Sequence, residues 1–291
     1  QNLVMAAGGL TIFTTSDDQL QFQTATVLLN NGSNLAGTTS GGAIIVQAGI
    51  RGTSDETVDL NASGGTTNTI DVGAIGNADE ILSVQLNGPG GVTSRGDIVT
   101  SSTAGGNQVT IDGPISFTGD RVINTSAGDG NIDIDAADGS TGPDGLDFTL
   151  NAGAGTVTFE TVGTDAASDT VNAFSVTGTT INANGSVYTG VDSGTNTGDV
   201  SFSGAVVLGA NVTVDSTDGG GGSAGSVDFS STVDSSGTPG YDLTVQAGTG
   251  GGTASFNGVV ATDAARDLMK ALTVTGGTIN LGASIFTGED S

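Results

Sequence analysis

The side chains with the greatest chemical potential in this sequence are the aspartates of NIDIDAADG, residues 131–139. Asp133 and Asp135 alternate, so in a strand both would lie on one face, and Asp138 follows three residues later. Paired carboxylates can cleave glycosidic bonds when they flank a sugar. The matching segments 43–49 and 226–234 do not keep the trio, and no aromatic platform for sugar rings is evident. We therefore expect no enzyme activity and favour a solvated acidic face.

Calcium is a second hypothesis for the same carboxylates, because hard cations take several oxygens from Asp side chains and loop carbonyls. DIDAADG, 133–139, resembles a D-x-D-x-D-G loop, except that Ala137 stands where Asp is wanted. The nonapeptide of calcium-binding β-rolls does not occur in repeated form. Calcium held by Asp133, Asp135 and Asp138 therefore competes with plain acidic loops as an interpretation.

Other chemistry is restricted by composition. The chain has no His and no Cys, which excludes Ser-His and Cys-His nucleophiles, disulfides and thiolate metal sites. Five basic residues against 31 acidic ones give a net charge of −26, which argues against nucleic-acid or anionic-lipid partners. No apolar run approaches the roughly 20 residues of a membrane span. A chain without cysteine suits an exported bacterial surface protein.

Internal repeats organise the chain. The tetrapeptides TIFT (11–14), DIVT (97–100), SVYT (186–189) and SIFT (284–287) recur at steps of 86, 89 and 98 residues. Self-similarity at a nearly fixed period is typical of repeat architectures. We predict a single continuous solenoid over 1–291, with long repeats at roughly 11–97, 98–186 and 187–284.

Short segments that alternate apolar and polar residues predict strands, and Gly, Asn, Asp and Ser between them predict turns. Tandem β-sandwiches are one alternative, but there is no Trp and no stretch with the composition of a linker. We predict instead an all-β, right-handed parallel β-helix of about twelve coils, each of about 22–26 residues. Val200, Phe202 and Val206 should face inward, together with the strand phenylalanines Phe117, Phe148, Phe159, Phe229 and Phe256. The segments 76–80, 164–169 and 262–267 should project from one side.

The segments GDVSFSGAVVLGANVTVDS (198–216), GSVDFSSTVD (225–234) and YDLTVQAGTGGGTASFNGVV (241–260) resemble repeats of filamentous-haemagglutinin-like and autotransporter-like bacterial surface adhesins. The resemblance covers residues 106–291 well and 1–105 more loosely. It implies a right-handed β-helix that is secreted to the bacterial cell surface and serves as a stalk, an adhesin or a fibre. Partners implied in this way are a host or neighbouring-cell surface.

Both ends of the sequence alternate like strands, with NLVMAAGGLTIFT at 2–14 and TINLGASIFTG at 278–288. Exposed strand edges favour association. We therefore predict a filament in which copies stack head to tail; continuation within one longer chain, as in an adhesin stalk, is the alternative. The predicted interface comprises Leu3, Val4, Ile12, Phe13, Ile285 and Phe286. Stacking would also bring together the carboxylates Asp17, Asp18, Glu289 and Asp290, where a divalent cation such as calcium could bridge them.

Overall fold

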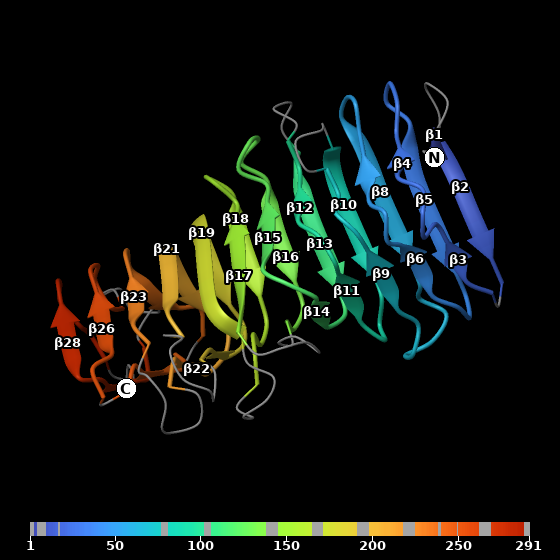
Figure 1. The fold of residues 1–291 in the computed structure, drawn as a ribbon. Helices are drawn as coiled ribbons and strands as arrows, with labels where there is room; N and C mark the ends of the chain where they lie inside the picture. Colours follow the sequence, from blue (N-terminus) through green and yellow to red (C-terminus); the bar gives the residue numbers. More distant parts are fainter. Residues whose placement is uncertain are drawn as a thin grey trace. The chain divides into compact units, whose positions relative to one another are not determined.

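The structure is a computed structural model that describes residues 3–4, 10–16, 18–76, 81–101, 106–137, 145–164, 171–190, 198–217, 225–237, 240–248, 250–261 and 269–287. These residues contain only strands and connections, and so no helix that could cross a membrane. They form two compact units: unit 1 contains Gln1–Asp135 and Asn151–Gly155, and unit 2 contains Ala136–Leu150 and Thr156–Ser291. Within each unit, parallel strands stack coil upon coil as a β-solenoid (Figure 1). This confirms the predicted fold class.

Unit 1 carries three ladders of parallel strands, one on each side of its coils. Ladder A consists of β2 (Leu10–Thr15), β5 (Asn34–Thr39), β8 (Glu56–Asn61), β10 (Ile81–Asn87), β13 (Gln108–Asp112) and β16 (Asn131–Ile134). Ladder B consists of β3 (Leu20–Gln21), β6 (Ile44–Val46), β9 (Ile70–Val72), β11 (Val92–Ser94) and β14 (Ile115–Phe117). Ladder C consists of β1 (Leu3–Val4), β4 (Val27–Leu28) and β7 (Ile50–Arg51), and continues through Ile75 to β12 (Ile98–Val99) and β15 (Arg121–Asn124).

Unit 2 has the same three-sided plan. Ladder D contains β18 (Thr156–Phe159), the second halves of β19 (Val171–Ala183) and β21 (Val200–Leu208), and β24 (Val233–Ser235). Ladder E contains β17 (Leu146–Asn151), the first halves of β19 and β21, β23 (Val227–Phe229), β26 (Thr253–Phe256) and β28 (Thr278–Leu281). Ladder F contains β20 (Val187–Tyr188), β22 (Val212–Asp215), β25 (Asp242–Gln246) and β27 (Ala271–Thr275).

The strand registers give the length of a coil. In ladder A the aligned partners stand 23 to 26 residues apart: Thr11, Leu35, Val58, Val84, Val109 and Ile132. In ladder D they stand 24 to 27 residues apart: Val157, Ile181, Val206, Val233, Val260 and Ile285. The coil length is thus close to the prediction in these two ladders, whereas aligned partners in ladder F stand up to 31 residues apart, as Val212 and Leu243 do. The described strands make about nine turns in all, fewer than the predicted number of about twelve coils. The three long repeats remain a prediction.

The core of each coil consists of side chains at alternate strand positions. Val200, Phe202 and Val206 are each 1% exposed, as predicted. The other predicted core phenylalanines are also buried: Phe117, Phe148, Phe159, Phe229 and Phe256. Burying one such side chain stabilises the fold by about 1.5–3 kcal/mol relative to leaving it in water. Of the segments predicted to project from one side, 77–80, 165–169 and 262–267 lie outside the described residues.

Several corners between ladders are closed by a buried hydroxyl that donates to a glycine carbonyl further along the chain. These hydrogen bonds join Thr39 to Gly42 (2.5 Å), Thr125 to Gly130 (2.5 Å), Ser216 to Gly225 (2.9 Å) and Thr189 to Gly198. The hydroxyl satisfies a carbonyl that the turn removes from the strand ladders. The same bond therefore closes corners whose intervening chain differs in length.

Candidate assembly surface

The last rung of unit 2 is apolar and uncovered. Ile279 and Leu281 of β28 are 45% and 55% exposed, although they align with Ala254 and Phe256 of β26, which are 0% and 1% exposed. Two of the three large hydrophobic side chains found exposed in the described part of the chain are therefore inward-facing residues of this one rung. Their exposure follows from the absence of a described coil above them.

The rest of this rung repeats the pattern. Leu272 and Val274 of β27 align with the buried residues Leu243 and Val245 of β25 but are only half-buried themselves. Ile285, which bridges to buried Val260, is also half-buried, as is Phe286. Within the described residues, β28 pairs only with β26, so its other edge presents unpaired backbone N–H and C=O groups (Figure 1). Such an edge is a template for another parallel strand.

The other predicted half of the interface lies on β1 and β2, at the edge strands of unit 1. Val4 is 56% exposed, and Phe13 is half-buried with its ring edge-on to Phe22 at a centroid distance of 5.2 Å. Leu3 and Ile12 occupy these strands, but their side chains lie outside the described part of the chain. The structure thus places Val4, Phe13, Ile285 and Phe286 on edge rungs.

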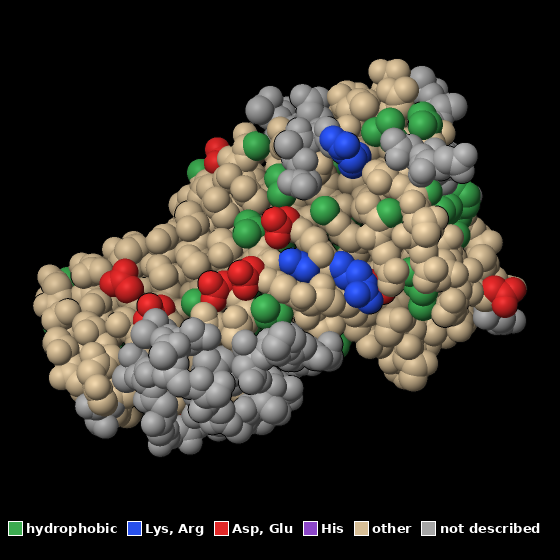
Figure 2. All heavy atoms as spheres, in the orientation of Figure 1, with side chains coloured by type: hydrophobic (Ala, Val, Ile, Leu, Met, Phe, Trp, Pro, Cys, Tyr) green, Lys and Arg blue, Asp and Glu red, His purple; other side chains and the backbone are tan. Residues whose placement is uncertain are grey.

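Neither edge rung carries a charged side chain. Residues 1–16 and 271–287 contain no Asp, Glu, Lys or Arg, in a chain with a net charge of −26. The nearest basic residue, Lys270, is 3.6 Å from the carboxylate of Asp242 and is therefore already paired. Over the face shown in Figure 2, by contrast, acidic side chains are dispersed between other polar surface. The edge rungs share this lack of charge with interior stretches such as residues 19–50 and 171–190.

The predicted calcium ligands are only partly brought together. Asp133 and Asp135 lie beside Asp112 on the outer side of ladder A, and Asp135 accepts a hydrogen bond of 2.7 Å from the backbone N–H of Gly113. Partial burial raises the pKa of Asp133, and the neighbouring Asp112 and Asp135 raise it further. Partial burial and Asp135 likewise raise the pKa of Asp112. Burial is the main cause of both pKa shifts, and the neighbouring like charges add to it.

No group of three or more metal-ligating side chains is arranged to hold an ion within the described ranges. Asp18 is exposed, and its backbone carbonyl, not its carboxylate, accepts a hydrogen bond from Thr15. Asp17, Asp138, Glu289 and Asp290 lie outside the described residues. Calcium therefore stays a prediction.

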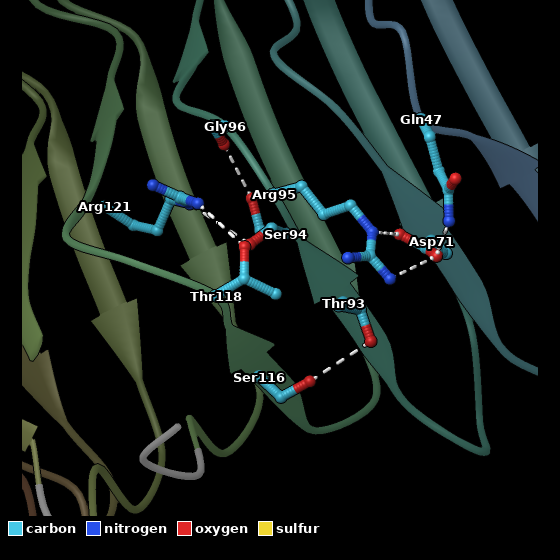
Figure 3. A network of polar contacts seen from close by, with 9 residues as sticks. All are labelled: Gln47, Asp71, Thr93, Ser94, Arg95, Gly96, Ser116, Thr118 and Arg121. Atoms are coloured by element: carbon cyan, nitrogen blue, oxygen red, sulfur yellow. Dashed lines mark hydrogen bonds and ion pairs between the residues drawn. The ribbon is translucent and has the colours of Figure 1, made fainter. Parts of the chain in front are cut away.

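One polar network on ladder B was not foreseen from the sequence (Figure 3). Asp71 accepts hydrogen bonds from Nε and Nη2 of Arg95 at 2.6 and 2.8 Å, and from Nε2 of Gln47 at 2.6 Å. The three residues stand 24 positions apart, one coil each, so the coil period is the signal that could have revealed them. The network links three successive coils from outside. Each of its bonds joins a residue of one coil to a residue of the next.

A second feature that the sequence did not reveal is the buried carboxylate of Glu56, which is 0% exposed. It accepts hydrogen bonds from the backbone N–H groups of Gly32, Thr53 and Ser54 at 3.1, 2.8 and 2.7 Å. Gly32 belongs to the preceding coil, so this carboxylate joins two turns. Charge-assisted bonds to several donors are what make a buried carboxylate tolerable.

Comparison with known proteins does not assign the chain to a family. No family profile matches the chain, and neither a curated protein nor a solved structure is significantly similar to it. The β-solenoid agrees with the architecture implied by the adhesin-like repeats, while no relative supports an adhesin.

Proposed function

We propose that this chain is a structural, extracellular β-solenoid that forms a subunit or segment of a bacterial surface filament, with copies joined head to tail. The observation that carries the proposal is the stacking of parallel coils in each unit, whose outermost described rung in unit 2 carries Leu272, Val274, Ile279, Leu281 and Ile285 at core positions. Further support comes from the adhesin-like repeats and from the lack of His and Cys for catalysis.

A second copy suits this rung for two reasons. The edge strands β1 and β2 of the second copy are parallel-sheet strands, and they offer the same kind of backbone edge as β28 of the first. Both edge rungs are uncharged, so joining them buries no charge of either copy. In a stalk segment of a large adhesin, the next coil of the same polypeptide would occupy the rung instead. A calcium ion at Asp17, Asp18, Glu289 and Asp290 would then be an additional bridge at the junction.

The proposal is tested by electron microscopy and light scattering of the purified 291-residue chain. We expect fibres whose length grows with protein concentration. Leu281→Asp should prevent them, because it places a charge in the core of the junction. Asn280→Asp is the matched control: it adds the same charge to the same strand, but at an outward position that aligns with Ser255. A monodisperse monomer at high concentration would contradict the proposal.

A further inference from the structure

Four asparagines of this chain are followed directly by glycine: Asn31, Asn87, Asn184 and Asn257. An Asn-Gly pair is the dipeptide most prone to deamidate, because glycine has no Cβ to keep its backbone nitrogen away from the asparagine side chain. The reaction requires that nitrogen to lose its proton and to move onto Cγ of the asparagine. A glycine N–H that donates a hydrogen bond within the fold is held away from this geometry. The four pairs can therefore be ranked by the bonds that they make.

Two of the pairs have their glycine N–H engaged. The N–H of Gly32 donates to Oε1 of the buried carboxylate of Glu56 at 3.1 Å, and that of Gly88 donates to the backbone carbonyl of Asp112 at 2.9 Å. Low solvent access does not protect the first pair, since Asn31 and Gly32 are both exposed. Its protection comes from the hydrogen bond to the neighbouring coil.

The other two pairs lie at corners of unit 2. Within the part of the chain that the structure describes, neither Gly185 nor Gly258 donates a backbone hydrogen bond. Asn184 and Asn257 are both exposed, so water can reach them. Their side chains differ: Nδ2 of Asn257 donates to Asp228 at 2.9 Å, whereas the amide of Asn184 has no hydrogen bond to any described residue. Asn184 and Gly185 therefore form the least restrained pair.

Packing keeps a glycine at position 185. A Cβ added there would lie 2.4 Å from the backbone nitrogen of Thr161 in the preceding coil, which is closer than non-bonded atoms approach. The corner therefore cannot exchange Gly185 for a larger residue that would slow the reaction. The stacking of the coils itself maintains a reactive Asn-Gly pair at this place.

We infer that Asn184 deamidates spontaneously in the folded protein, ahead of Asn257 and far ahead of Asn31 and Asn87, and that the product weakens unit 2. The nitrogen of Gly185 gives up its proton and bonds to Cγ of Asn184, while the Cγ–Nδ2 bond breaks and ammonia leaves. Water then opens the cyclic imide at either of its carbonyls, which gives aspartate or isoaspartate. The net reaction consumes one water molecule, releases one ammonia molecule and involves no oxidant or reductant.

The product alters the contact between two coils. Phe159 aligns with Ala183 on ladder D, so the residues that follow them, Glu160 and Asn184, are neighbours on adjacent coils. A carboxylate at position 184 therefore lies beside that of Glu160, and like charges directly opposite each other destabilise a strand pair. Isoaspartate in addition lengthens the backbone at a corner where Gly185 already fits tightly.

The test incubates the purified chain in mildly alkaline buffer and follows each Asn-Gly pair by peptide mass spectrometry. We expect Asn184 to deamidate about tenfold faster than Asn31 or more, since the hydrogen bond of Gly32 must break first and a cost of about 1.4 kcal/mol is a factor of ten in rate. The rate at Asn257 should lie between them. In urea, where the fold is lost, the four rates should converge.

Two outcomes would overturn the ranking. The first is an equal rate at Asn184 and Asn31 in the folded chain, which would show that the hydrogen bond of Gly32 gives no protection. The second is a difference between these sites that persists unchanged in urea, which would assign it to the local sequence and not to the fold. Neither measurement depends on assembly, so the result is independent of the proposed filament.

Variants test the effect on stability without the reaction itself. Asn184→Asp places the charge of the product beside Glu160 and should lower the midpoint of urea unfolding of unit 2. Asn184→Gln is the matched control: it keeps a neutral amide, deamidates far more slowly and should stay near the wild-type midpoint. Adding Glu160→Gln to Asn184→Asp should restore the midpoint. Equal midpoints of Asn184→Asp and Asn184→Gln would overturn the weakening of unit 2.

Discussion

The two units share one coil plan but fill it differently. The buried residues of unit 1 are mainly aliphatic, as in the aligned column Leu35, Val58, Val84, Val109 and Ile132. Unit 2 instead contains a column of stacked rings, in which Phe229 lies 5.0 Å from both Phe202 and Phe256. Rings in register fix the rotation of one coil on the next through their flat contact.

Unit 1 has other means of fixing its register. Its coils are tied by directional polar bonds: buried Glu56 accepts a bond from the N–H of Gly32 in the coil before it, and Arg95 donates to Asp71 across ladder B. Unit 2 has polar bonds between coils as well, from Asn182 to Thr158 and from Asn257 to Asp228, but adds the ring column to them. The comparison indicates that the register of a parallel solenoid can be specified by stacked rings in the core or by polar bonds between coils.

The largest effect is expected in the ring column. Phe229→Ala should destabilise unit 2 by about 3–5 kcal/mol, because the cavity has a ring on each side and cannot collapse easily. Phe229→Leu should cost about 1.5 kcal/mol or less. Urea unfolding, combined with hydrogen exchange of the two units, measures the loss and locates it. A loss under about 1 kcal/mol for the alanine variant would show that the rings do not hold the coils together.

A smaller effect is expected at the margin of unit 1. Glu56→Ala leaves three backbone N–H groups without their acceptor, and each buried unpaired group costs about 1–3 kcal/mol. We expect a total loss of roughly 2–4 kcal/mol, since water can reach part of the turn. Asp59→Asn, at an exposed position of the same strand, is the control and should be neutral in the same urea titration. Equal stabilities of the two variants would show that Glu56 does not stabilise the stacking of unit 1.

The smallest effect concerns pH. Asp112 and Asp133 have a raised pKa in the folded state, so folding favours their protonated forms. Their contribution to stability therefore rises as pH falls through the folded-state pKa values, and is complete below the unfolded value of about 3.9. At pH values above the folded-state pKa values the full penalty is present. Asp133→Asn should slightly raise stability at pH 7 and flatten its pH dependence between pH 7 and 4. A destabilised variant at pH 7 would contradict this assignment.

Much of the fold could be predicted because a solenoid repeats its physical constraints in every coil. Alternation placed Val200, Phe202 and Val206 in the core, and the recurrence of similar segments indicated stacked coils. Glu56 could not be predicted in this way. Within SDETVDL it has the appearance of a charged turn, and one of its three backbone donors, Gly32, comes from the preceding coil while Thr53 and Ser54 are local. Partners one coil apart are invisible until the coil length is known.

The candidate assembly surface was predicted from the same alternation, and the exposure of Ile279 and Leu281 adds two residues that the predicted interface did not include. The repeated tetrapeptide points only to Ile285 and Phe286, whereas Ile279 and Leu281 lie on a different strand of the same rung. The alignment with Ala254 and Phe256 identifies them.

The hydroxyl-closed corners have a consequence for how such a protein can change over generations. Thr39 closes a corner onto a residue three positions on, Thr125 five positions on, and Thr189 and Ser216 nine positions on. Because the bond fixes only the base of each excursion, insertions and deletions between donor and acceptor leave the strand ladders untouched. At each such corner, segments can therefore be inserted or deleted during evolution without a change in the fold of the stacked coils.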